Sequence, residues 1–188
     1  MKRHMAWLSV GITLVLVVSV YAAHSDYGCV SCHTPHSAKA MTGVPLWNGK
    51  ETIKSFAGKM YKDSGKGTLD ATMAVEPDGS SKLCLSCHDG TNTHTTIGVS
   101  AWDDLSVNHP ISFVYDSQLA QKDGALKDPG LPSGLGGTIA QDMLEGGKVQ
   151  CISCHDTHKS GIGTAYLRGY DYFQGVNGGA LCRACHEQ

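Results

Sequence analysis

Cys29-Val-Ser-Cys32-His33 is the first of four copies of one five-residue pattern that decides how this chain folds. In each copy two cysteines are separated by two residues, and a histidine follows the second cysteine directly. The other copies are Cys84-Leu-Ser-Cys87-His88, Cys151-Ile-Ser-Cys154-His155 and Cys182-Arg-Ala-Cys185-His186. The chain has 188 residues and 8 cysteines, and all of the cysteines belong to this pattern.

The pattern C-x-x-C-H is the attachment motif of c-type haem. Its two thiols add to the two vinyl groups on one edge of a porphyrin, and the adjacent histidine reaches the iron through a neutral imidazole. A different gap between the cysteines, or a missing histidine, would break this geometry. We therefore predict four covalently bound haems, whose proximal iron ligands are His33, His88, His155 and His186.

Other uses of paired cysteines explain the pattern less well. Two C-x-x-C pairs can form a zinc site, and an even number of cysteines in an exported chain can form a disulfide framework. Neither use requires a histidine after the second cysteine, yet all four copies have one. Thioredoxin-like redox chemistry is disfavoured for the same reason, and because no βαβ pattern surrounds the motifs.

The composition indicates a chain with little side-chain core of its own. There are 23 glycines but only 3 Phe and 3 Trp, and charged residues make up 17%. Glycine disfavours a bundle of long helices, and a net charge of −2 without a basic stripe disfavours nucleic-acid binding. We expect a fold that is mostly irregular coil with short helices and few short strands, wrapped around the four haems.

A few local elements are expected within this coil. Short helices should cover the four motifs, and residues 111–115 form the best strand. Residues 138–145 form the best other helix, capped by Thr138 and ended by Gly146. Residues 124–137 are rich in Pro and Gly and should form a loop.

The N-terminus is typical of a secretory signal. Lys2 and Arg3 precede an apolar run over 5–20, and Tyr21-Ala22-Ala23 closes the segment. We expect cleavage after Ala22 or Ala23, which leaves a tetrahaem cytochrome domain over 24–188. Without cleavage, the segment would act as a membrane anchor, although it makes a poor span.

The remaining histidines are candidates for the second axial position of each iron. His36 and His158 each follow a proximal histidine by three residues, so they leave the backbone on the same side of their own haem. They should therefore ligate a neighbouring haem. His94 and His109 complete the expected distal set, and His24 is left without a role. Methionine is the other common sixth ligand, and the weaker candidates are Met41, Met60, Met73 and Met143.

The chain resembles the filament-forming outer-surface multihaem c-type cytochromes, the nanowire cytochromes of metal-reducing bacteria, and their tetrahaem members above all. The resemblance lies in residues 24–36, in residues 151–158, and in Ala180-Leu-Cys-Arg-Ala-Cys-His186 near the C-terminus. It implies export to the cell surface, a continuous stack of bis-histidine haems, and subunits joined end to end. It also implies that His36 ligates a haem of the next subunit, the one bound by the third motif. By the same analogy, His158 serves the first-motif haem.

The sequence thus predicts an electron carrier rather than an enzyme, with other multihaem cytochromes and an extracellular acceptor as partners. Two alternatives stay open, namely a membrane-anchored tetrahaem quinol dehydrogenase and a soluble periplasmic tetrahaem shuttle. A multihaem reductase would need an iron with an open sixth position. The spare histidines are sufficient to fill all four, and the C-x-x-C-K variant of such enzymes is absent.

Overall fold

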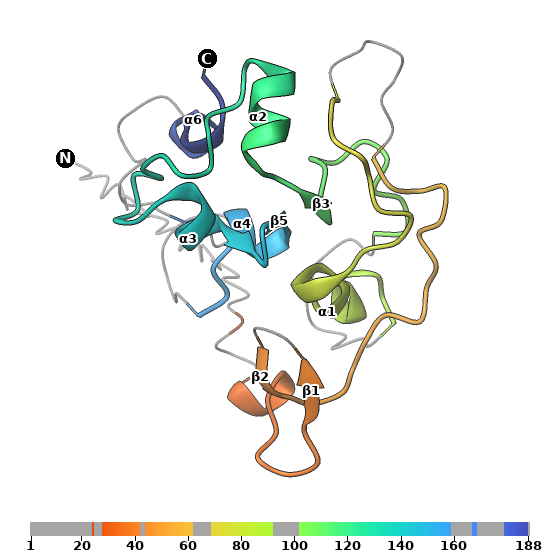
Figure 1. Ribbon diagram of the computed structural model, residues 1–188. Helices are drawn as coiled ribbons and strands as arrows, with labels where there is room; N and C mark the ends of the chain where they lie inside the picture. The colour runs from red at the N-terminus through yellow and green to blue at the C-terminus, as the bar shows by residue number, and fades with distance from the viewer. Residues whose placement is uncertain are drawn as a thin grey trace, which may run out of the picture.

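Most of the described residues are coil, which short helices and strands interrupt (Figure 1). The computed structural model describes residues 24, 28–41, 44–61, 69–91, 102–158, 167–168 and 179–187. The expectation of a coil-rich fold with short helices and few short strands is confirmed for these residues. No helix among them is long and apolar enough to cross a membrane. The predicted signal segment 1–23 lies outside the described residues.

In the described part of the chain, the helices and strands are all short. The helical elements are η2 (Cys29–Ser31), α1 (Gly79–His88), α2 (Ser117–Asp123), α3 (Ile139–Met143), α4 (Cys151–Cys154) and α6 (Ala180–Cys185). The strands are β1 (Lys39–Met41), β2 (Val44–Trp47), β3 (Phe113–Val114), β4 (Leu144–Glu145) and β5 (Lys148–Val149). As expected from the sequence, a helical turn covers each of the four motifs.

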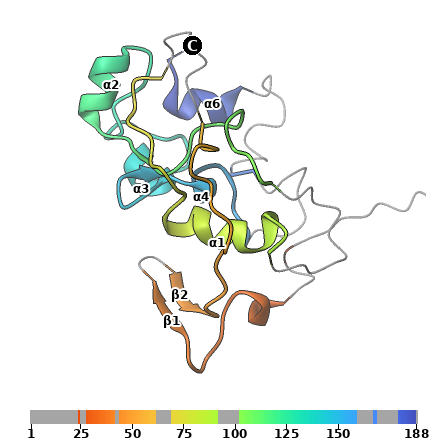
Figure 2. The same cartoon turned by 90° about the vertical axis from the view of Figure 1, so that its right-hand side faces the viewer.

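The four motifs follow one another along the molecule in sequence order. The β1–β2 hairpin and η2 lie at the bottom of Figure 1, α1 lies above them, α4 is next, and α6 is at the top. The view turned by 90° shows the same succession (Figure 2). The motifs are therefore arranged as a row, with the first and the fourth at opposite ends.

Two small antiparallel sheets hold this row in place. Strands β1 and β2 pair next to the first motif, with Lys39 opposite Trp47. Strand β5 lies between β3 and β4 in the second sheet, and it leads directly into the third motif. The strand expected over 111–115 is thus present but covers only Phe113–Val114.

The helix expected over 138–145 is shorter than predicted. Thr138 caps α3 as expected, with its side chain accepting a hydrogen bond from Gln141 N. However, Leu144–Glu145 leave the helix and pair with β5. Gly146 and Gly147 both have positive φ, at 60° and 78°, which is the backbone of a tight hairpin turn. Two successive glycines therefore form a hairpin here rather than a helix stop.

Apolar side chains form two clusters. The larger cluster contains Phe113, Tyr115, Leu119, Ala120, Ile139, Met143, Val149 and Ala184. The smaller cluster, to which α1 contributes Leu85, contains Phe56, Met60, Leu85 and Leu105. Met60 and Met143 are buried in these clusters. Their packing explains both residues, so neither needs a role as an iron ligand.

Candidate haem-binding sites

Each motif presents its three reactive side chains from one helical turn. In the first, third and fourth motifs the histidine N–H donates to the carbonyl of the first cysteine, at 2.8, 3.1 and 2.9 Å respectively. The second motif lies inside α1 and ends it at His88. The two thiols and the histidine of each motif are therefore held in a common local frame.

A distant segment then fixes the backbone of each proximal histidine. Three of these histidines form antiparallel bridges, which are His33 with Trp47, His155 with Leu167 and His186 with Leu126. For the fourth, Trp102 N donates to the His88 carbonyl at 2.7 Å. Long-range pairing thus orients each motif even though little regular structure surrounds it.

The thiols of successive motifs lie close to one another. A hydrogen bond joins the Cys84 and Cys151 side chains, which raises the pKa of Cys84 and lowers that of Cys151. Burial raises the pKa of Cys32, and the nearby Cys87 thiol raises it further. The first motif therefore neighbours the second, and the second neighbours the third.

The fourth motif continues this succession. Burial raises the pKa of Cys154, and the charge of Cys182 adds to the effect. Burial raises the pKa of Cys185 to about 11, with Cys154 as a further cause. The order of the four motif helices along the row in Figures 1 and 2 is thus also the order in which their thiols influence one another's pKa.

Three proximal histidines each have a second histidine ring at a similar separation. The ring centres lie 6.2 Å apart for His33 and His158, 5.9 Å for His88 and His24, and 6.4 Å for His186 and His109. Ordinary aromatic pairs have ring centres about 4.5–7 Å apart, so the planes and partners of the rings matter as well as their separation. A metal lies about 2 Å from an imidazole nitrogen, and the ring centre lies roughly 1 Å further on, so two rings sharing one metal have centres roughly 6 Å apart. The three pairs have the separation of two axial ligands.

A hydrogen bond at Nδ1 fixes the tautomer of two of these histidines. The Nδ1–H of His33 donates to the carbonyl of Pro45 at 2.8 Å, and that of His109 donates to the carbonyl of Pro110 at 2.9 Å. A hydrogen bond at Nδ1 leaves Nε2 as the nitrogen that can bind a metal. His33 in the first motif and His109 beside the fourth thus each present Nε2 for ligation.

Burial keeps several of the rings neutral. It is the main cause that lowers the pKa of His24, His88 and His186. A second histidine adds to each effect, namely His155 for His24, His24 for His88 and His109 for His186. Neutral imidazole is the form that ligates metals.

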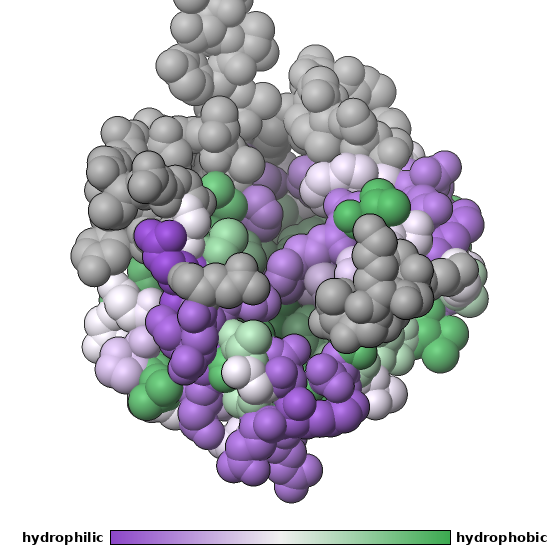
Figure 3. Space-filling model, turned by 90° about the horizontal axis from the view of Figure 1, so that it is seen from above, coloured by the Kyte–Doolittle hydropathy of each residue, from purple (hydrophilic) through white to green (hydrophobic). Residues whose placement is uncertain are grey.

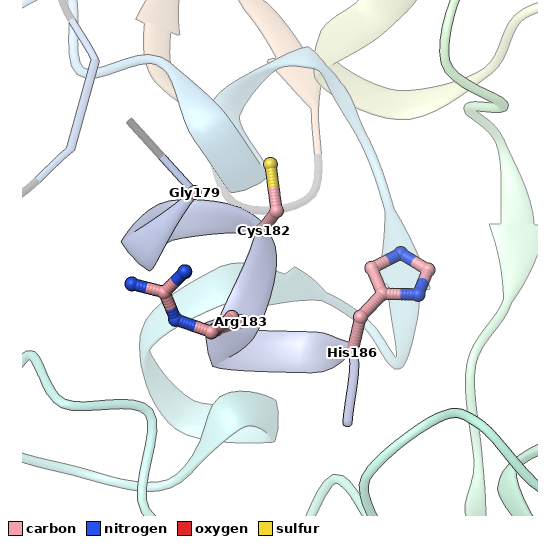
Figure 4. Close-up of a pocket in the computed structure, with 4 residues that line it drawn as sticks. All are labelled: Gly179, Cys182, Arg183 and His186. Atoms are coloured by element: carbon pink, nitrogen blue, oxygen red, sulfur yellow. The ribbon is translucent and has the colours of Figure 1, made fainter. Parts of the chain in front are cut away.

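A cavity lies beside the fourth motif. A cavity of about 400 Å³ is lined by Gly179, Cys182, Arg183 and His186, and the Cys182 thiol and the His186 ring extend from the same helix around it (Figure 4). Seen from above, apolar surface lies at the bottom of a hollow in the described part of the molecule (Figure 3).

The cysteines and histidines are arranged as separate units. None of the eight cysteines forms a disulfide bond. Within the described ranges, no group of three or more His, Cys, Asp or Glu side chains gathers as metal ligands. A haem supplies four nitrogens to its iron, so it needs only two ligands from the protein. Pairs of histidines beside pairs of thiols fit that group.

The structure places some of the expected distal histidines beside proximal histidines and others elsewhere. His158 lies beside His33 and His109 beside His186, whereas His36 is exposed in the loop between η2 and β1. His94 lies outside the described residues. The sequence reasoning gave no role to His24, whose ring lies beside His88. Its position two residues before Asp26 and five before Cys29 carries no spacing signal that could have singled it out.

A buried polar network joins the second and third motifs. Gln150, which directly precedes Cys151, is only 2% exposed. Its Oε1 accepts hydrogen bonds from the hydroxyls of Ser81 at 2.5 Å and Ser112 at 3.0 Å. Its Nε2 donates to Asp78 at 2.6 Å. Ser81 also accepts from the Cys151 N–H at 2.9 Å, so the network links α1 to the start of α4.

We expect Gln150→Ala to lower the free energy of unfolding of the haem-loaded protein by about 2–3 kcal/mol, because it leaves two buried hydroxyls without their acceptor. Chemical denaturation followed by circular dichroism measures the change. Gln141→Ala is the matched control, since Gln141 is exposed and only caps α3. Equal effects of the two variants would show that the network does not join the motifs.

Comparison with known proteins finds no family model that matches the chain and no similar curated protein.

Proposed function

We propose that the chain is a tetrahaem c-type cytochrome that carries electrons and makes or breaks no substrate bonds. The observation that carries this proposal is the repeated unit of two thiols and one histidine, which in three cases has a second histidine ring about 6 Å away. Four such units in one row support a path for electrons along the molecule.

The chain's own residues would hold the haems and set their properties. Cys29, Cys32, Cys84, Cys87, Cys151, Cys154, Cys182 and Cys185 would attach them, and the iron-bound histidines would come from facing segments. Bis-histidine ligation and burial are the levers by which a protein sets haem potentials. Bound haem would supply the one-electron chemistry, while the chain spaces the groups and limits access of water.

The same proposal includes assembly into an extracellular filament. His36 is exposed in the loop between η2 and β1, and β1 lies at the end of the row in Figure 1. A ligating histidine at one end of a copy and a haem site elsewhere on the next copy would form a heterologous contact. Such a contact propagates into a filament instead of closing into a dimer. Export to the cell surface, other multihaem cytochromes as donors and an extracellular acceptor belong to this proposal.

We expect the protein, produced in a host with a c-type maturation system, to carry four covalent haems. The mass of the intact chain and the pyridine haemochrome spectrum count them, because thioether-bound haem survives denaturation. The double variant Cys84→Ser, Cys87→Ser should carry one haem fewer. A mature chain with free thiols and no bound haem would refute the proposed function.

A further inference from the structure

We propose that His24 is the sixth ligand of the iron bound by the second motif, opposite His88. This inference rests on the proposed function and adds a ligand that the spacing of the motifs does not indicate. It replaces His94, the ligand that the sequence suggested for this haem once His109 is placed beside the fourth motif.

The separation of the two rings supports the assignment. The ring centres of His24 and His88 lie 5.9 Å apart, close to the 6.2 and 6.4 Å of the other two pairs. The planes are tilted by 46°, which two axial ligands can adopt because each rotates about its own metal–nitrogen bond. The ring separation of this pair therefore matches that of the other two pairs, and ligation of one shared metal determines this separation.

The surroundings of His88 hold its ring in place for such a partner. The Trp102 ring stacks on it with centres 5.2 Å apart and planes within 20°. The hydrogen bond from Trp102 N to the His88 carbonyl at 2.7 Å fixes the backbone at the same point. Nδ1 of His88 is buried and has no hydrogen-bond partner among the described residues. These contacts hold the His88 ring in place, with the ring centre of His24 5.9 Å away.

The count of histidines is consistent with this assignment. With His158, His24 and His109 serving the first, second and fourth motifs, only the third-motif haem needs a further ligand. His36 of a neighbouring copy can supply it, as the resemblance to filament-forming cytochromes implies. His94 is then not required for the second haem.

The test compares His24→Ala with His94→Ala in the full, haem-loaded protein. Mass spectrometry first confirms that each variant retains all four haems and the same processing site. Near-infrared magnetic circular dichroism and electron paramagnetic resonance then report spin state. We expect one high-spin haem of the four in His24→Ala, which added imidazole restores to low spin. His94→Ala should leave the second-motif haem low-spin.

A second comparison identifies the haem that His24 serves. In the background Cys84→Ser, Cys87→Ser, which lacks the second haem, His24→Ala should add no high-spin signal. His24→Met keeps a ligand in place and should raise the potential of one haem, because thioether ligation favours the reduced iron. This variant also tests ligation if the alanine variant or the cysteine variant fails to fold.

The outcomes separate the inference from the function on which it rests. Four low-spin bis-histidine haems in His24→Ala, or unchanged potentials in His24→Met, overturn the role of His24 and leave the cytochrome intact. A high-spin signal that persists in the background without the second haem assigns His24 to another iron and also overturns the inference. A wild-type chain without haem refutes the proposed function itself.

Discussion

Replacing His36 with alanine is expected to abolish filaments while leaving export and the attachment of four haems intact. The imidazole that would bind the neighbouring copy is then absent, so one haem in each subunit loses its sixth ligand. An iron–imidazole bond at each junction would add to ordinary burial at the interface. The loss should therefore be complete, not a shortening of the filaments.

The position of His36 supports this expectation. It is exposed in the loop between η2 and β1, and β1 lies at one end of the row in Figures 1 and 2. The ring contacts between described residues pair His33 with His158 and do not include His36. The loop itself is anchored, because Thr34 N donates to the Leu46 carbonyl at 2.7 Å and Asn48 N to the Cys32 carbonyl at 2.9 Å.

Electron microscopy of the secreted protein measures filament formation, and the haem spectrum measures the lost ligand. Ser37→Gly is the matched control, because Ser37 is exposed in the same loop at a φ of 56° that glycine adopts readily. Filaments of normal length from His36→Ala would refute the proposal that His36 ligates a haem of the neighbouring copy. A wild-type protein that stays monomeric would instead favour the soluble electron shuttle.

The local chemistry of the site could be read from the sequence because it depends on short spacing. Cys151, Cys154 and His155 must share one helical turn whatever the rest of the chain does, and the structure has that turn. The partner of a histidine depends instead on how distant segments return. His33 and His158 are far apart in sequence, and their approach is set by tertiary packing that no local pattern encodes.

The same distinction between local signals and tertiary packing bears on the errors in the predicted fold. The signals for α2 were local and were overlooked: the Asp116 side chain caps Leu119 N at 2.8 Å, and Gly124 ends the helix with a φ of 73°. The end of α3 was misjudged because Leu144–Glu145 gain a strand partner in β5, and helix signals do not report on such pairing. His24 was left without a role because nothing near it in sequence shows that the chain returns to His88.

Phe56→Ala is expected to have the largest effect on stability, because this side chain fills the cluster behind the second motif. Phe56 is 0% exposed and packs with Met60, Leu85 and Leu105. Leu85 lies within the motif itself, between Cys84 and Ser86. Removing a fully buried phenyl ring costs about 3–5 kcal/mol, part of it from the cavity that remains.

The backbone around Phe56 limits how far this cavity can collapse. Phe56 N donates to the Glu76 carboxylate at 2.7 Å, and Lys59 N donates to the Phe56 carbonyl at 2.8 Å. Guanidinium unfolding of the haem-loaded variant measures the loss. Ile53→Ala is the control, since Ile53 is 86% exposed and surface changes usually stay within about 0.5 kcal/mol. If both variants unfold at the same denaturant concentration, the Phe56 cluster does not support α1, and the second motif must be held by its polar contacts alone.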